Sequence, residues 1–142
     1  MTRREEIVAA ARLWIGTPYR HQASLIGVGC DCLGLVRGVW RMTVGEEPEA
    51  PPPYTAEWAE AKPDEALLGA ALRWFVPVAS SEMSAGDLIV FRWRDGSPAK
   101  HLGIATSSTR MIHAHDAANV CEVHVGTGWR RRIAGVFAFP GV

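Results

Sequence analysis

The stretch GCDCLGLVRGVW, residues 29–40, places two of the chain's three cysteines on either side of a single aspartate. Apolar residues follow at spacings of three and four, and this periodicity predicts a helix from about Asp31 to Met42. Cys30 and Cys32 therefore lie at the expected start of this helix. A metal site, a disulfide and a catalytic nucleophile would each explain why two thiols stand together here.

Helical patterns occupy the first half of the chain. The first is an amphipathic segment that should end at Gly16 and Pro18, and its apolar face is formed by Ile7, Ala11, Trp14 and Ile15. The proline-rich stretch from Glu46 to Tyr54 breaks regular structure, since consecutive prolines fit neither a helix nor a central strand. PDEALLGAALRWF, residues 63–75, then predicts a third helix with Pro63 and Asp64 at its start.

The second half of the chain changes to short β-like runs separated by turn residues. The expected strands are residues 87–93, 101–108, 110–115, 121–126 and 132–140. Helices that precede strands indicate an α+β domain, in which N-terminal helices pack on a small, mostly antiparallel β-sheet. With 142 residues, of which 48% are hydrophobic, the chain is expected to form one domain over residues 1–142.

Charge and apolar content narrow the classes of function. Fifteen basic and fifteen acidic residues cancel, which argues against nucleic acid as a partner. The N-terminal head MTRREE mixes charges, and the apolar run behind it is interrupted by Arg12. We therefore expect no targeting segment and no membrane insertion. An odd number of cysteines without such a segment fits free thiols better than a disulfide framework.

The three explanations for the two thiols differ in their physical demands. A disulfide between Cys30 and Cys32 would close a very tight loop with strained geometry. Zinc-binding cysteine pairs are usually separated by two or more residues, and the sequence has no matching second pair, so we expect no metal and no cofactor. A cysteine in the first turn of a helix meets unpaired backbone N–H groups and the positive end of the helix dipole, which favour the thiolate. On this local pattern alone, a nucleophile and a buried structural cysteine explain Cys32 equally well.

Two histidines farther along the chain favour the nucleophile. KHLGIATS, residues 100–107, places His101 at the start of a strand, and RMIHAHD, residues 110–116, places His113 in the next strand. The turn between them predicts a hairpin, which can hold one imidazole beside the thiolate and a second imidazole behind the first. His115 should share the strand face of His113 and is the alternative orienting residue.

The remaining aromatic and thiol side chains are interpreted as mainly structural. Trp14, Trp40 and Trp74 fall on the apolar faces of expected helices. Cys121 begins a strand without a partner in the sequence, and we interpret it as buried packing.

The motifs GTPYR, DCLGLV, GDLIVF, HLGIA and MIHA occur in the order and at the spacing of a known family. Over nearly its whole length the chain resembles the NlpC-type cell-wall peptidases, which are cysteine hydrolases with a small papain-like fold. The resemblance implies that Cys32 is the nucleophile, His101 the general base and His113 the residue that orients the base. It also implies that Tyr19 lies near the oxyanion position and that Asp31 helps to bind the free amine of a peptidoglycan stem peptide.

Two departures from the family pattern point to one branch of it. Leu33 follows Cys32 where the family commonly has serine, and RHQASLIG follows Tyr19 where it commonly has Trp-Gly-Gly. Both features are similar to the branch found in phage tail gene clusters and gene transfer particles. The resemblance thus implies an enzyme made in the cytoplasm and carried by phage-like tail proteins. It would act in the periplasm or cell wall of a target cell, on the γ-D-glutamyl–diaminopimelate bond of the stem peptide.

Two alternatives remain open at this point. An acyltransferase or amidase on the same fold could use the same three residues on a different acyl group. A non-catalytic tail protein could retain the fold to bind murein, although a binding module has no need of a poised thiolate.

Overall fold

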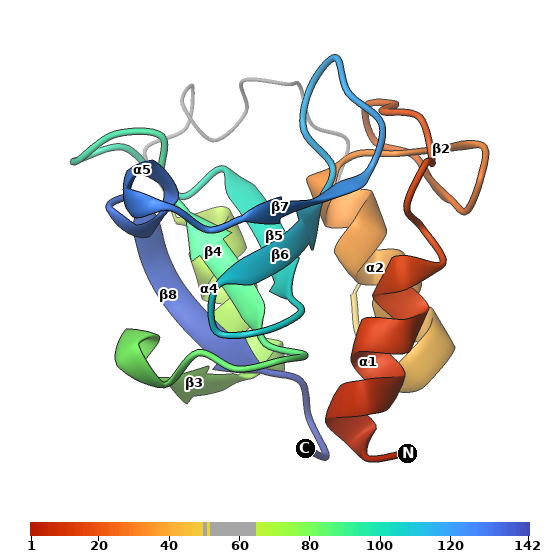
Figure 1. Ribbon diagram of the computed structural model, residues 1–142, viewed down its shortest axis with the longest axis horizontal. Coiled ribbons are helices and arrows are strands. Elements are labelled where there is room, and N and C mark those ends of the chain that lie inside the picture. The colour runs from red at the N-terminus through yellow and green to blue at the C-terminus, as the bar shows by residue number, and fades with distance from the viewer. Residues whose placement is uncertain (50, 52–64) are drawn as a thin grey trace.

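The computed structural model describes residues 1–49, 51 and 65–142, and Figure 1 shows how its elements are arranged. The helices are α1 (Arg3–Arg12), α2 (Cys32–Thr43), α4 (Ala66–Trp74) and α5 (Thr127–Arg130), with a 3-10 turn η1 (Ser80–Glu82). The strands are β1 (Ser24–Leu25), β2 (Gly29–Cys30), β3 (Val76–Val78), β4 (Leu88–Phe91), β5 (His101–Ala105), β6 (Arg110–His113), β7 (Cys121–His124) and β8 (Ile133–Ala138).

One sheet of six strands, in the order β3-β8-β4-β5-β6-β7, organises the molecule. Every neighbouring pair in it is antiparallel. Helices α1 and α2 lie together against β5 at one side of this sheet (Figure 1). The expected α+β fold, with N-terminal helices on an antiparallel sheet, is confirmed. Among the described residues, no helix is long and apolar enough to cross a membrane.

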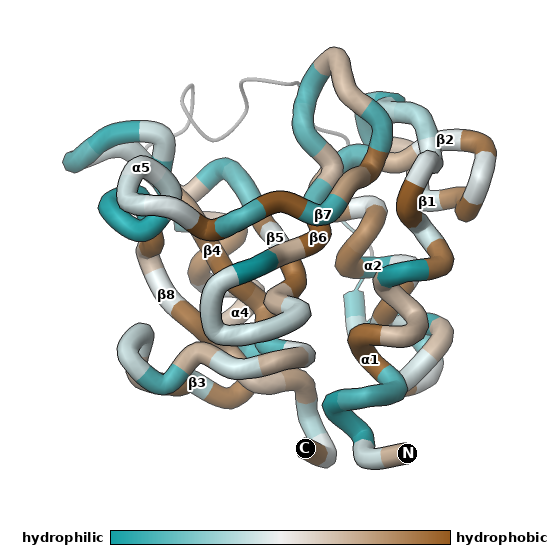
Figure 2. Tube along the Cα trace, in the orientation of Figure 1, coloured by the Kyte–Doolittle hydropathy of each residue, from teal (hydrophilic) through white to brown (hydrophobic). Residues whose placement is uncertain are grey.

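The central strands β4 and β5 are buried along their whole length, because both faces of the sheet are covered. Side chains of β4 alternate between the two faces. Leu88 and Val90 join the larger core beneath the helices, whereas Ile89 and Phe91 join a smaller core on the opposite face. In Figure 2 the brown colour of apolar residues marks the course of β4. This double burial explains why β4 is an unbroken apolar run and not an alternating one.

Two expectations about helix faces were wrong. Helix α1 ends at Arg12 and the chain continues in turns, so Ile15 points outward and is 45% exposed, whereas Trp14 is buried as expected. Trp74 lies in the last turn of α4 and is 38% exposed, although Trp40 is buried. In both cases the apolar periodicity of the sequence continues past the point where the chain loses contact with the core.

Three short strands were not predicted. Strand β3 contains Pro77, which is tolerated because β3 is an edge strand and the missing N–H has no partner to serve. Strands β1 and β2 are two residues each, too short to give a periodic signal. The expected helix start at Pro63 and Asp64, and part of the proline-rich stretch, lie outside the described residues.

The approach of the N-terminal segment to α2 depends on one glycine. The indole of Trp14 is 2% exposed and packs on the backbone of α2 at Gly38. A Cβ at Gly38 would lie 1.9 Å from Cζ2 of Trp14, so only glycine leaves room for the ring. The Nε1–H of Trp14 donates to Sδ of Met42 at 3.3 Å, which holds the indole in this position.

We therefore expect G38A to lower the free energy of unfolding by about 2 kcal/mol, because the overlap with a buried indole outweighs the better helix propensity of alanine. G69A is the matched control, since a Cβ at Gly69 of α4 meets nothing closer than Nη1 of Arg73 at 3.6 Å. That variant should be unchanged or more stable by up to about 1 kcal/mol. Urea unfolding of both variants measures the difference, and equal effects would contradict the packing argument.

Candidate active site

The start of α2 is held by Asp31, which is 3% exposed and directly precedes Cys32. Its Oδ1 accepts the N–H of Gly34 at 2.7 Å, which caps the helix, and its Oδ2 accepts the N–H of Gln22 at 2.8 Å. Asp31 is therefore the N-cap residue of α2. One buried carboxylate thus joins the first turn of α2 to the loop that follows Tyr19.

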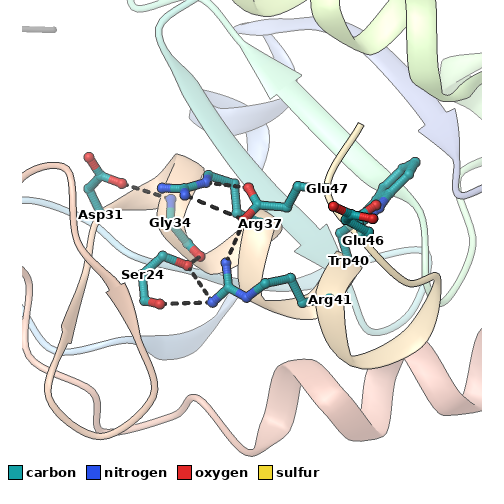
Figure 3. Close-up of polar contacts among 8 residues, drawn as sticks. All are labelled: Ser24, Asp31, Gly34, Arg37, Trp40, Arg41, Glu46 and Glu47. Carbon is teal, nitrogen blue, oxygen red and sulfur yellow. Dashed lines mark hydrogen bonds and ion pairs between the residues drawn. The ribbon is translucent and has the colours of Figure 1, made fainter. Parts of the chain in front are cut away.

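The hairpin of β1 and β2 packs on the same turn of α2, as Figure 3 shows. The hydroxyl of Ser24 donates to the carbonyl of Gly34 at 2.6 Å, and Arg41 donates to the carbonyl and hydroxyl oxygens of Ser24 at 2.8 and 3.0 Å. A Cβ at Gly34 would lie 1.8 Å from the carbonyl oxygen of Ala23. This close approach requires glycine, so the hairpin can pack on the first turn of α2 because residue 34 has no side chain.

The sulfur of Cys32 lies against the backbone at the start of β5. The thiol donates to the carbonyl of Lys100 at 3.9 Å, and the N–H of Leu102 is bonded to the sulfur. Lys100 and Leu102 flank His101 in the chain. The first residue of α2 and the first residue of β5 are therefore neighbours in space, although they are 69 positions apart in the sequence.

The protonation of this thiol differs from the expectation. Burial of the sulfur, together with the adjacent Asp31 carboxylate, raises the pKa of Cys32 to about 12. The N–H groups of Leu102 and Leu33 act in the opposite direction and are outweighed. The expectation of a thiol shifted toward the thiolate is thus wrong for the free protein. A helix terminus is typically worth about 1 kcal/mol or less to a charge, which is too little to offset burial beside a carboxylate.

His101 begins β5 and His113 ends β6, and both side chains are buried, at 3% and 4% exposure. Nε2 of His101 lies 2.9 Å from Nδ1 of His113, so one ring donates a hydrogen bond to the other. The ring of His115 is centred 5.6 Å from that of His101, and its own Nδ1 lies 3.3 Å from the carbonyl oxygen of Asp116. Of the two candidate partners of His101, His113 lies at hydrogen-bonding distance, whereas His115 meets it through a ring contact.

Burial also determines the charge of the two imidazoles. Desolvation, followed by His113 and His115, holds the pKa of His101 well below 6.5. Desolvation, followed by His115, lowers the pKa of His113 to about 4. Both rings are therefore neutral near pH 7. When Nε2 of His101 donates to His113, Nδ1 of His101 carries a lone pair that can accept a proton.

Tyr19 precedes the hairpin and is joined to Cys30 by an isolated β-bridge. Burial raises the pKa of its phenol to about 12, with smaller contributions from the charges of Cys32, Asp31 and Asp116 when these are ionised. Because charges act strongly only over short distances, the phenol of Tyr19 lies close to Cys32. It stays protonated and can donate a hydrogen bond to an oxygen that becomes negative there.

Three aromatic side chains around His101 were missed by the sequence analysis. The imidazole centroid lies 5.1 Å from that of Trp93, 5.5 Å from that of Trp129 and 5.7 Å from that of Phe91. The planes of Trp93 and Trp129 are within 25° and 26° of the imidazole plane, so both contacts are stacked. The predicted strand 87–93 could have suggested Phe91 and Trp93 as neighbours on one face. Nothing in the sequence connects Trp129 to His101.

The other two cysteines adjoin this cluster, since Cys30 is bridged to Tyr19 and Cys121 is the partner of His113 across β6 and β7. All three cysteines of the chain are free thiols. Cys30 is fully buried, and burial, followed by Asp31, raises its pKa to about 12. Cys121 begins β7 and is only partly buried. Within the described residues, no group of three His, Cys, Asp or Glu side chains is arranged to hold a metal ion.

Comparisons with known proteins place the chain in a family. The model of the NlpC/P60 family matches residues 16–138. An NlpC/P60 family protein from Bacillus cereus ATCC 10987 has a similar structure, with a TM-score of 0.68 and 20% sequence identity over 96% of this chain and 40% of that chain. The NlpC/P60 domain of the peptidoglycan hydrolase SagA gives a TM-score of 0.65 and 23% identity over 96% of this chain and 98% of that chain. A comparison with curated proteins finds no match.

Because the family model covers most of the sequence, the chain belongs to the NlpC/P60 family, whose members are cell-wall peptidases of the cysteine hydrolase class. The solved structures share its fold at low sequence identity, which confirms the expected NlpC-type architecture. The chain spans about two fifths of the Bacillus cereus protein and nearly all of the SagA domain.

Two buried neutral imidazoles should make the fold sensitive to acid. The ordinary histidine pKa is 6.5, whereas the pKa of His113 in the folded chain is about 4. The stability tied to this difference is fully present above pH 6.5 and is lost as the pH falls toward 4, because only the unfolded chain takes up the proton. For His113 the loss amounts to about 3 kcal/mol.

Melting temperatures measured by circular dichroism from pH 7.5 to 4.5 test this expectation. H113Q should lose less stability over that range than the parent chain, because one of the buried titrating groups is absent. H124Q is the control, since His124 is exposed on β7, and it should follow the parent. A parent melting temperature that stays constant between pH 7.5 and 4.5 would show that the imidazoles are not held neutral by the fold.

Proposed function

We propose that this protein is a peptidoglycan stem-peptide hydrolase in which Cys32 is the nucleophile, His101 the general base and His113 the residue that orients the base. The observation that carries the proposal is the 2.9 Å contact between Nε2 of His101 and Nδ1 of His113, beside the strand backbone that contacts Sγ of Cys32. Membership of the NlpC/P60 family supports the same assignment.

The proposed reaction starts from a neutral thiol and a neutral imidazole. As Sγ of Cys32 bonds to the carbonyl carbon, Nδ1 of His101 accepts the thiol proton, and the carbonyl oxygen becomes negative. Backbone N–H groups at the start of α2 and the hydroxyl of Tyr19 can donate to that oxygen. The carbon–nitrogen bond then breaks, His101 protonates the leaving amine, and the acyl group remains on Cys32. Water, deprotonated by His101, releases the acyl group and restores the thiol.

We propose the γ-D-glutamyl–diaminopimelate bond as the bond cleaved, with Asp31 on the side of the substrate's free amine and Tyr19 near the oxyanion position. SagA, which shares the fold, is a peptidoglycan hydrolase, and this supports a peptidoglycan substrate. Both carboxylate oxygens of Asp31 already accept a backbone N–H, so an amine would meet the lone pairs that remain. These two bonds hold the carboxylate of Asp31 in one position, so it would present a fixed acceptor to the amine of the substrate.

Purified protein incubated with soluble muropeptides, followed by mass spectrometry of the products, tests the assignment. C32A and H101A should each lower kcat/KM by about 10³-fold or more, because nucleophile and base act as a unit. H113Q should retain a measurable fraction, since an amide can still orient the imidazole. C30A is the matched control and should cleave at nearly the parent rate.

The same experiment separates the alternatives. Products in which the acyl group is transferred to an added amine, with little hydrolysis, would indicate an acyltransferase. Muropeptide binding without any product, in the parent as well as in C32A, would indicate a murein-binding module. Loss of activity in C30A but not in C32A would overturn the choice of nucleophile.

We further propose that the enzyme is carried on a phage-like tail particle. The segment after Tyr19 departs from the common family pattern, and it exposes Leu25, Ile26 and Val28 at 58%, 41% and 54%. Apolar side chains gathered on a surface hairpin suit contact with a protein partner better than contact with water. A tail protein bound there would keep the enzyme near the wall at high effective concentration.

Particles purified from a producing culture should contain this protein, as measured by immunoblotting. The triple variant L25S/I26S/V28S should be depleted from particles and still cleave muropeptides in solution. L72S is the control, because Leu72 is 57% exposed on α4 and outside the hairpin. Equal recovery of the triple variant and the control in particles would exclude the hairpin as the docking surface, and absence of the parent protein from particles would exclude the delivery route.

A further inference from the structure

Two tryptophans from distant segments cover the ring of His101. Trp93 follows β4, and Trp129 lies on α5. Their centroids are 5.9 Å apart and their planes are tilted by 48°, so each indole covers a different part of the imidazole. His113 and His115 contact the same ring edge-on, at 78° and 72°. The base is thus surrounded by rings that leave little space for water.

Arg132 joins the two segments that carry these indoles. Its Nε donates to the carbonyl of Trp93 at 3.0 Å, and its Nη1 donates to the carbonyl of Gly128 at 3.2 Å. The N–H of Arg92 in turn donates to the carbonyl of Arg132 at 2.8 Å. A helix of four residues such as α5 has little stability of its own. These bonds, together with the bond from Nη2 of Arg130 to the carbonyl of Ser108 at 2.7 Å, hold it in place.

We infer that Trp93 and Trp129 are positioning residues of this site, which keep water from His101, hold its ring toward His113 and keep the imidazole neutral until it receives the thiol proton. The inference rests on the proposed function, in which His101 is the general base. Neither indole needs to touch the reacting atoms.

An indole face has two opposite effects on a nearby imidazole. It attracts an imidazolium cation when the centroids are within about 6 Å, which would raise the pKa. It also excludes water, which disfavours the cation and lowers the pKa. The pKa of His101 is well below 6.5, and desolvation is the first cause. Exclusion of water is therefore the larger effect, and removal of an indole should raise the pKa.

The titratable and charged groups around His101 do not change the expected direction, which is a rise in the pKa of His101 when an indole is removed. His113 of β6 and His115 lower the pKa of His101 further, because a second positive charge beside it is unfavourable. Cys32 of α2 is a neutral thiol, since its own pKa is about 12. The guanidinium of Arg132 donates to the backbone carbonyls of Trp93 and Gly128.

The test compares W129A and W129F with W74A in the full chain. Trp74 is 38% exposed on α4 and is not among the rings that contact His101 within the described part of the chain, so W74A controls for the loss of an indole elsewhere. Histidine titration by NMR gives the pKa of His101. The pH dependence of kcat/KM on muropeptides gives the apparent pKa of the same group during catalysis. W129A should raise the pKa of His101 by about 1, while W129F and W74A stay near the parent value.

In kinetics, W129A should move the acid limb of kcat/KM to higher pH by the same amount, so that the loss approaches tenfold only on that limb and stays under about threefold at pH 8. A uniform loss at every pH, or an unchanged or lowered pKa of His101 in W129A, would overturn the inference and leave Trp129 a packing residue. If W129A does not fold, R132A tests the same arrangement, because it frees both indoles without removing a ring, and its acid limb should shift in the same direction. If the parent protein cleaves no muropeptide, the proposed function fails, whereas the NMR titration still decides the inference.

Discussion

The carboxylate of Asp31 accepts one N–H from the first turn of α2 and another from the loop after Tyr19, and the first of these bonds is buried and the second partly buried. A buried N–H left without a partner would cost about 1–3 kcal/mol, so this single side chain determines where the helix starts and where the loop meets it. The position of Cys32 follows from that helix start. Its chemistry follows as well, because the same carboxylate raises the pKa of the neighbouring thiol.

A thiol that resists ionisation requires a base in contact with it during the reaction. His101 is kept neutral by burial, so it can accept the thiol proton without first losing one of its own. Transfer of that proton changes a neutral pair into an ion pair while the net charge of the site stays constant. The indole faces of Trp93 and Trp129 attract the imidazolium that forms, but their exclusion of water disfavours it by more. The surroundings of the base thus set both its resting charge and its capacity to take up a proton.

The architecture was largely predictable from local patterns. Apolar periodicity indicated α2 and most of α1, and unbroken or alternating apolar runs indicated β4, β5, β6, β7 and β8. The expectations about burial failed where the apolar periodicity of the sequence extends beyond the part of the helix that contacts the core. Ile15 and Trp74 are examples, and both are exposed. Strand β3 was missed because its proline is acceptable only at a sheet edge, and strand order is a property of the whole chain.

The sequence by itself determined that a cysteine stands at a helix start, that two histidines stand on successive strands, and that the motifs around them have the order and spacing of the NlpC-type peptidases. The tertiary structure decided that His113 and not His115 is within hydrogen-bonding distance of His101. It also decided that the thiol is neutral and that Trp129 covers the base. The spacing of residues along the sequence indicates which of them share one face of a helix or strand, because that spacing follows helix and strand geometry. Distances between elements, and the exclusion of water that sets a pKa, depend on packing among segments that are far apart in the chain.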